Sequence, residues 1–112
     1  MSSLEPRFPP PDAAPIFAAL GDGTRLSLLA KLSDGQTRSI VKLSADTKLT
    51  RQAITKHLRV LEGAGLVNRI RVGRESQFAF RAEPIVEIKS YLDYVSGQWD
   101  SALSRLRSLI EE

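Results

Sequence analysis

The sequence predicts a mostly helical fold with one small β-hairpin, of the α+β class. Three observations predict it. Apolar residues recur at helical spacing through most of the chain, alternate with polar residues only around residues 66–80, and recur every three or four positions from residue 83 to the end. A chain of 112 residues is one small domain with a modest core. We expect residues 13–82 and a terminal helix over 83–112 to form one compact domain.

The chain begins with a proline-rich segment, in which five of the first fifteen residues are proline. This composition predicts a disordered or extended tail over residues 1–12, with a polyproline ligand as the alternative.

Three short helices are expected before the most basic part of the chain. The first covers residues 16–20, and the second covers residues 24–32 with leucines on its buried face. Those leucines are Leu26, Leu28, Leu29 and Leu32. Asp22 and Arg25 are expected either to pair with each other or to cap neighbouring helices. A third short helix covers residues 39–43 and is followed by a polar turn.

The next predicted helix has two chemically different faces. It begins after Thr50, a suitable N-cap, and ends at the glycines at positions 63 and 65. Its apolar stripe contains Ile54, Leu58 and Leu61. The polar and cationic side chains opposite or beside the stripe, together with the N-cap, are Thr50, Arg51, Gln52, Thr55, Lys56 and Arg59. Amides and cations of this kind suit base edges and phosphates of a DNA major groove, whereas the alternative is an ordinary solvated face.

A β-hairpin is predicted directly after this helix. Apolar and polar residues alternate over residues 66–72, residues 73–76 form the turn, and Phe78 and Phe80 resume the alternation. We expect the aromatic rings to face inward. The arginines expected to face outward, toward a flanking phosphate or the minor groove, are Arg69, Arg71, Arg74 and Arg81. Such a basic hairpin is a wing, and the alternative is an edge hairpin whose charges only prevent aggregation.

Positive charge is concentrated in the same stretch. The whole chain carries +3, but residues 48–74 contain seven basic residues and one acidic residue, which gives +6 there and −3 elsewhere. This concentration indicates a polyanionic partner. A short helix, a tight turn and a second helix with an exposed polar face form the helix-turn-helix arrangement of DNA-binding proteins.

The C-terminal segment predicts self-association. Its helix would be about 45 Å long, more than so small a domain can cover. Apolar residues follow a heptad seam, which predicts a homodimer with a shared interface. The expected interface consists of Phe17, Ile88, Leu92, Val95, Trp99, Ala102, Leu106 and Leu109. Ile85 and Ile88 could instead pack on the domain's own core. Two-fold symmetry would place two basic helices roughly 34 Å apart, on an imperfect palindrome.

The chain resembles the ArsR/SmtB-type winged helix-turn-helix repressors. The resemblance runs from ALGDGTRLSLLAKL through TRQAITKHLRVLEGAGLV to IRVGRESQFAF and the long terminal helix, with KHLRVLEGAGLV as its most specific part. The ending SYLDYVSGQWDSALSRLRSLIEE is similar to a metal-free branch often encoded beside START-like ligand-binding proteins. Where the family commonly has Asp-Pro-Thr-Arg, this chain has Asp22-Gly23-Thr24-Arg25.

The resemblance also implies where metal-sensing members hold their ion. They use Cys pairs on the helix before the basic helix, or His and acidic residues on the terminal helix. Residues 38–44 and 83–112 contain neither Cys nor His. We therefore expect no metal site and no cofactor. His57, the single histidine, is expected to be structural or adjacent to a phosphate.

Other classes of function find little support in the sequence. It contains no Gly-rich phosphate-binding loop and no nucleophile beside a base, so we expect no enzyme. It also lacks Cys, an N-terminal signal and a long apolar run, so we expect a cytoplasmic protein that does not enter membranes.

These observations predict a homodimeric transcriptional repressor that binds double-stranded DNA. Gln52, Thr55, Lys56 and Arg59 would read or grip the major groove, while Arg69, Arg71 and Arg74 would hold the backbone. The alternative is a winged-helix interaction module that uses its basic face for an acidic protein. The sequence leaves open whether a small-molecule or protein effector controls DNA binding. Tyr91, Tyr94 and Trp99 would either hold a small apolar ligand between the terminal helices or simply form the dimer core.

Overall fold

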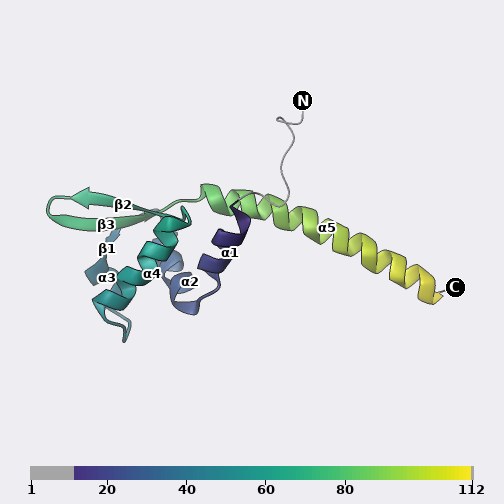
Figure 1. Cartoon of the computed structure of the whole chain (residues 1–112), viewed down its shortest axis with the longest axis horizontal. Coiled ribbons are helices and arrows are strands. Elements are labelled where there is room, and N and C mark those ends of the chain that lie inside the picture. The colour runs from purple at the N-terminus through teal and green to yellow at the C-terminus, as the bar shows by residue number, and fades with distance from the viewer. Residues whose placement is uncertain (1–11, 112) are drawn as a thin grey trace, which may run out of the picture.

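The computed structural model describes residues 12–111. Along the chain, the elements follow the order α1, α2, β1, α3, α4, β2, β3 and α5. Helices α1 to α4 and the small sheet gather at one end of the molecule, and α5 extends away from them (Figure 1). The tail expected over residues 1–12 lies outside the described residues except for Asp12, which immediately precedes α1.

Helices α1 (Ala13–Leu20) and α2 (Gly23–Leu32) form the first hairpin of helices. The Asp22 carboxylate caps α2 by accepting a hydrogen bond from the Arg25 backbone N–H at 3.1 Å, as a capping role predicts. Helix α1 begins three residues earlier than expected. The expectation that Leu26 is buried is wrong, because it lies on a different face of α2 from Leu28 and Leu32 and is 50% exposed.

Helices α3 (Ile40–Ser44) and α4 (Arg51–Gly63) form the predicted helix-turn-helix. The Ser39 hydroxyl accepts from the backbone N–H of Lys42, and the Thr50 hydroxyl accepts from that of Ala53, so both helices begin at capping side chains. The predicted apolar stripe of α4 is completely buried. The opposite face of α4 is therefore directed away from the core.

The sheet has three antiparallel strands in the order β1-β3-β2, formed by β1 (Arg38–Ser39), β2 (Val67–Val72) and β3 (Glu75–Phe80). The hairpin is confirmed, and its turn is two residues shorter than expected. Gly73 has a φ of +62°, which favours glycine in so tight a turn. Strand β1 was not predicted, because a strand of two residues shows no alternation.

One apolar core joins the helices to the sheet. It contains the stripe of α4, the leucines of α2, and residues from α1, α3, the sheet and the beginning of α5. Its largest fully buried side chains include Phe78, Ile16, Leu28, Leu32, Leu43 and Leu66. The sheet therefore packs on the back of α4 rather than standing apart from it.

Helix α5 (Glu83–Glu111) leaves this core after about two turns. Pro84 lies in its first turn, where a missing backbone N–H removes no helical hydrogen bond. The chain measures 67 × 39 × 21 Å with a radius of gyration of 18.7 Å, against about 13 Å for a compact domain of this length. Within the described residues, no helix is long and apolar enough to cross a membrane.

Candidate nucleic-acid interface

The exposed face of α4 carries the side chains that the sequence predicted for base contacts. Arg51, Gln52, Lys56 and Arg59 are all exposed. The Thr55 hydroxyl donates to the Arg51 carbonyl at 2.7 Å, so its proton is used within the helix and its oxygen is left to accept. This face combines one amide with three cations on a rigid helix, which is a chemically suitable surface for a major groove.

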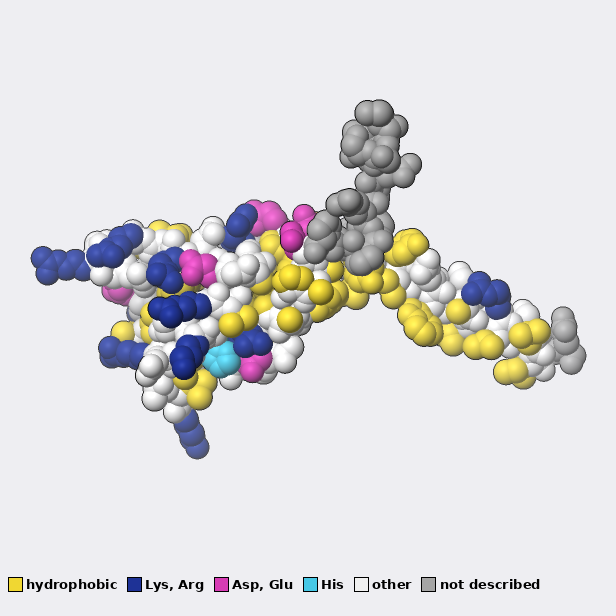
Figure 2. Space-filling view, in the orientation of Figure 1, with side chains coloured by type: hydrophobic (Ala, Val, Ile, Leu, Met, Phe, Trp, Pro, Cys, Tyr) yellow, Lys and Arg dark blue, Asp and Glu magenta, His cyan; other side chains and the backbone are white. Residues whose placement is uncertain are grey.

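The Lys and Arg side chains of α4 differ from several other basic side chains of the same end of the molecule. Elsewhere, Lys31 pairs with Asp46, and Arg38 forms two hydrogen bonds with Asp34, which hold the pKa of that carboxyl well below its usual range. Within residues 12–111, the Lys and Arg side chains of α4 form no such ion pair. Figure 2 shows Lys and Arg gathered over α3, α4 and the hairpin.

Two further lysines belong to this basic surface. Lys42 of α3 and Lys48 of the turn before α4 are both exposed. Lys48 entered the charge count but was not among the predicted contacts, and Lys42 was missed altogether. A helix of five residues shows too little periodicity to indicate which of its side chains face out.

His57 takes the structural role expected of it and helps to seat α4. Its Nδ1 lies 3.2 Å from Arg25 Nη1 and 3.9 Å from the Asp22 carboxylate. The same Arg25 donates through Nε to the Ala19 carbonyl at 2.6 Å and through Nη2 to that of Ala18 at 3.2 Å. This arginine therefore connects the end of α1 to α4, and these contacts help to orient α4.

The wing presents its arginines differently from the prediction. Arg69 lies opposite Phe78 and Arg71 opposite Ser76, so both arginines share a face with the aromatic rings. The expectation that they face away from the aromatics is wrong. Arg71 and Arg74 are nevertheless exposed near the tip, because the hairpin extends beyond the core. Arg81 pairs with Glu83 at 3.7 Å beside the start of α5.

Helix α5 presents the apolar stripe that the heptad pattern predicted. Leu92, Trp99, Leu106 and Leu109 are exposed, and Val95 and Ala102 are half-buried. From α1, Phe17 joins this surface, with its ring 6.4 Å from that of Tyr91. The assignment of Ile88 to the interface is wrong, because this side chain is 4% exposed and completes the domain's own core. The alternative stated for it was correct.

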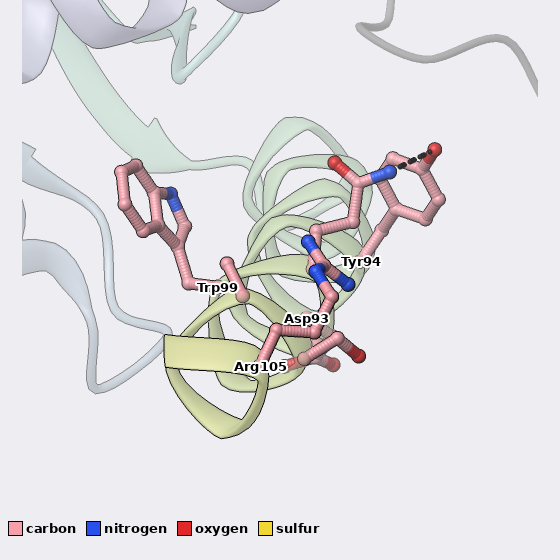
Figure 3. A pocket seen from close by; sticks show the side chains of 8 residues that line it. Asp93, Tyr94, Trp99 and Arg105 are labelled. Atoms are coloured by element: carbon pink, nitrogen blue, oxygen red, sulfur yellow. Dashed lines mark hydrogen bonds between the residues drawn. The ribbon is translucent and has the colours of Figure 1, made fainter. Parts of the chain in front are cut away.

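An open hollow on α5 falls short of a ligand site. It is lined by one helix alone, through Asp93, Tyr94, Gly97, Gln98, Trp99, Ser101, Ala102 and Arg105. Figure 3 shows Trp99 and Tyr94 on opposite sides of the helix, with Gln98 donating to the Tyr94 hydroxyl at 2.7 Å. A single helix cannot surround a small molecule. Within the described residues, no group of three His, Cys, Asp or Glu side chains could hold a metal ion.

Known proteins resemble this chain in sequence and in fold. The family model described as "Bacterial regulatory protein, arsR family" matches residues 22–69, which extend from the cap of α2 into β2. YuzN, an HTH-type transcriptional regulator of Bacillus subtilis, is 43% identical over 76 residues, which is 62% of this chain and 83% of YuzN.

Two solved structures share the architecture. An ArsR-like transcriptional regulator from Rhodococcus superposes with a TM-score of 0.74 and 32% identity, over 88% of this chain and 92% of its own. A Mycobacterium bovis winged helix-turn-helix DNA-binding domain, described as homodimeric, gives a TM-score of 0.62 and 23% identity over 78% and 80%. From these matches, the chain belongs to the ArsR family of bacterial regulatory proteins and is a DNA-binding transcriptional regulator.

Proposed function

We propose that this regulator is a homodimeric repressor that binds an imperfect palindrome. The observation that carries the proposal is the exposed face of α4, where unpaired cations and one amide lie opposite a fully buried stripe. A helix supported in this way can enter a major groove without losing its packing.

We assign base reading to Gln52 and Arg59. The Gln52 amide can donate to and accept from one adenine edge, and the Arg59 guanidinium can donate two hydrogen bonds to guanine. Both side chains are exposed. Lys56 and Arg51 supply cations for the backbone or for neighbouring bases. The Thr50 hydroxyl accepts from the Ala53 backbone N–H and keeps its proton for a phosphate, whereas the Thr55 hydroxyl donates to the Arg51 carbonyl and can accept only from a donor on a base.

The wing is proposed to hold the DNA backbone. Arg74 occupies the two-residue turn and is exposed, while Arg71 Nε donates to the Gly73 carbonyl at 3.2 Å. That bond directs the Arg71 guanidinium along the tip of the hairpin. Such contacts strengthen binding to every sequence alike.

Helix α5 is proposed to form the dimer. Its apolar stripe continues, largely exposed, for about five turns from Leu92 to Leu109, and the M. bovis domain with the same fold is described as homodimeric. Pairing of two α5 helices would cover the stripe and relate two α4 helices by two-fold symmetry. An effector that acts near Tyr94 and Trp99 would need this pairing, since the hollow there has a wall on one side only.

Selection of genomic fragments by the purified protein, followed by anisotropy titration against a scrambled duplex, tests the proposal. We expect a palindromic winner bound at least several hundred-fold more tightly at physiological salt. Gln52→Ala or Arg59→Ala should cost about 1–3 kcal/mol at one base position, whereas Arg74→Ala should weaken all duplexes alike. Equal affinity for both duplexes would contradict sequence-specific repression.

A further inference from the structure

Arg69 contacts both α4 and an aromatic ring of the hairpin, and its side chain is 45% exposed. Its Nη2 donates to Glu62 Oε1 at 3.2 Å, and its guanidinium carbon lies 5.7 Å from the centre of the Phe78 ring. Glu62 belongs to the last turn of α4, and Phe78 is a core residue that is 2% exposed. This one side chain therefore connects the end of α4, the wing and the core.

We propose that Arg69 is a positioning residue, which fixes the angle between the wing and α4, rather than a DNA contact. This inference rests on the proposed contact between the wing and DNA. Strands β1 and β2 are the two edge strands of the sheet, and β1 pairs with the central strand β3 at Phe78 and Gln77. Beside α4, the Arg69 bridge to Glu62 supports β2.

The position of Glu62 supports this role. It is the only acidic residue among residues 48–74, and it lies in the C-terminal turn of α4, where the helix dipole disfavours a carboxylate. A negative charge so near a phosphate-binding surface also opposes DNA binding. Pairing with Arg69 offsets both effects, and it gives the carboxylate a function that neither its charge nor its location would otherwise explain.

Positioning matters here because the tip of the wing lies beyond the backbone bonds that hold its root, which include Gly65 N–H to the Glu62 carbonyl at 3.0 Å and Leu66 N–H to the Leu61 carbonyl at 2.9 Å. The connection from α4 to β2 contains Gly65 at a φ of +76°, and the Leu66 carbonyl accepts from the Arg81 backbone N–H at 2.9 Å. Further out, Arg71 bonds within the turn to Gly73. A small rotation at the root would displace Arg74 from a phosphate, so a bridge placed between root and tip controls the geometry of the contact.

A double-mutant cycle separates positioning from contact. Glu62→Gln, Arg69→Gln and the double variant are titrated by anisotropy on the duplex that the wild-type protein prefers, at several salt concentrations. Since either change breaks the same bridge, we expect each single variant and the double variant to weaken binding by a similar factor, about three- to tenfold. The salt dependence of binding should stay near that of the wild-type protein for Glu62→Gln.

The direction of the change in DNA affinity in Glu62→Gln distinguishes positioning from a purely electrostatic effect. Removal of a negative charge from a DNA-binding surface strengthens binding if electrostatics alone operates. Binding that is unchanged or tighter in Glu62→Gln overturns the proposal. The proposal also fails if the salt slope falls by about 0.9 per site in Arg69→Gln and the two substitutions are additive in the double variant, because that result indicates a phosphate contact of Arg69.

Two controls complete the design. Arg74→Gln, at the exposed tip, should lower the salt slope, and no change in this variant would contradict the proposed wing contact itself. Without DNA, NMR order parameters of residues 70–77 should fall in Glu62→Gln while those of α4 stay constant. Unaltered wing order parameters together with unaltered affinity would overturn the positioning role and leave the repressor proposal intact.

Discussion

Replacement of Trp99 by alanine should weaken the dimer strongly. Trp99 is 65% exposed on α5, and a tryptophan side chain offers on the order of 200 Å². About 130 Å² of each ring is therefore free in the single chain, which corresponds to ~3 kcal/mol per ring at ~25 cal/mol per Å² when a partner covers it. Coverage of half that area in both protomers gives ~3 kcal/mol, or about a hundredfold increase in the dimer Kd.

Sedimentation equilibrium over a range of concentrations measures this change. The control is Val41→Ala, which truncates an aliphatic side chain that is 50% exposed on α3, at the other end of the molecule. Val41→Ala should leave the dimer Kd unchanged, and circular dichroism should show the helical content of both variants preserved. A Trp99→Ala variant that dimerises within threefold of the wild-type protein would refute the α5 interface.

Three further changes test the fold. Gly23→Pro should raise the free energy of unfolding by about 0.4–1 kcal/mol, because Gly23 is the first residue of α2 and a Cβ there meets nothing within 4 Å. The preceding Asp22 is already extended at φ −141°, as a residue before proline must be. An unchanged or lower thermal midpoint would contradict this prediction. Leu58→Ala should cost about 2–5 kcal/mol in denaturant unfolding, because Leu58 is completely buried; a cost below 1 kcal/mol would place it outside the core. Asp34 has its pKa lowered by Arg38, so this pair stabilises the fold above the unfolded-state pKa near 3.8 and loses its effect as pH falls through the folded-state pKa. Asp34→Asn should therefore reduce stability at neutral pH and weaken its decline between pH 4 and more acidic conditions, and an unaltered acid profile would show that the pair contributes nothing.

The sequence predicted α4 and the hairpin closely because their signals are strong and local. Thr50 is a capping residue, the apolar stripe repeats through three turns, and the glycine at position 65 does adopt a positive φ. The long α5 was predicted equally well by its heptad pattern. By contrast, β1 forms because it pairs with β3. This is a tertiary contact, and the sequence of residues 38–39 carries no pattern that predicts it.

The sequence was sufficient to predict on which face of the hairpin Arg69 lies. With either a two-residue or a four-residue turn, the pairing of β2 and β3 places Arg69 on the same face as Phe78 and Phe80. Alternation within β2 alone does not give this face, because only the register across the turn relates the arginines of β2 to the aromatic residues of β3. Ile88 differs from this case, because a heptad position can serve a core or an interface, and only the distance from the domain decides which.

Hydroxyl-radical footprinting of the selected duplex, together with the stoichiometry of the complex, tests the central claim most directly. A dimer that places two α4 helices in the major groove should protect two tracts whose centres lie about 10–10.5 base pairs apart, or a multiple of that spacing, with two chains per duplex. A single protected tract with one chain per duplex would contradict the account.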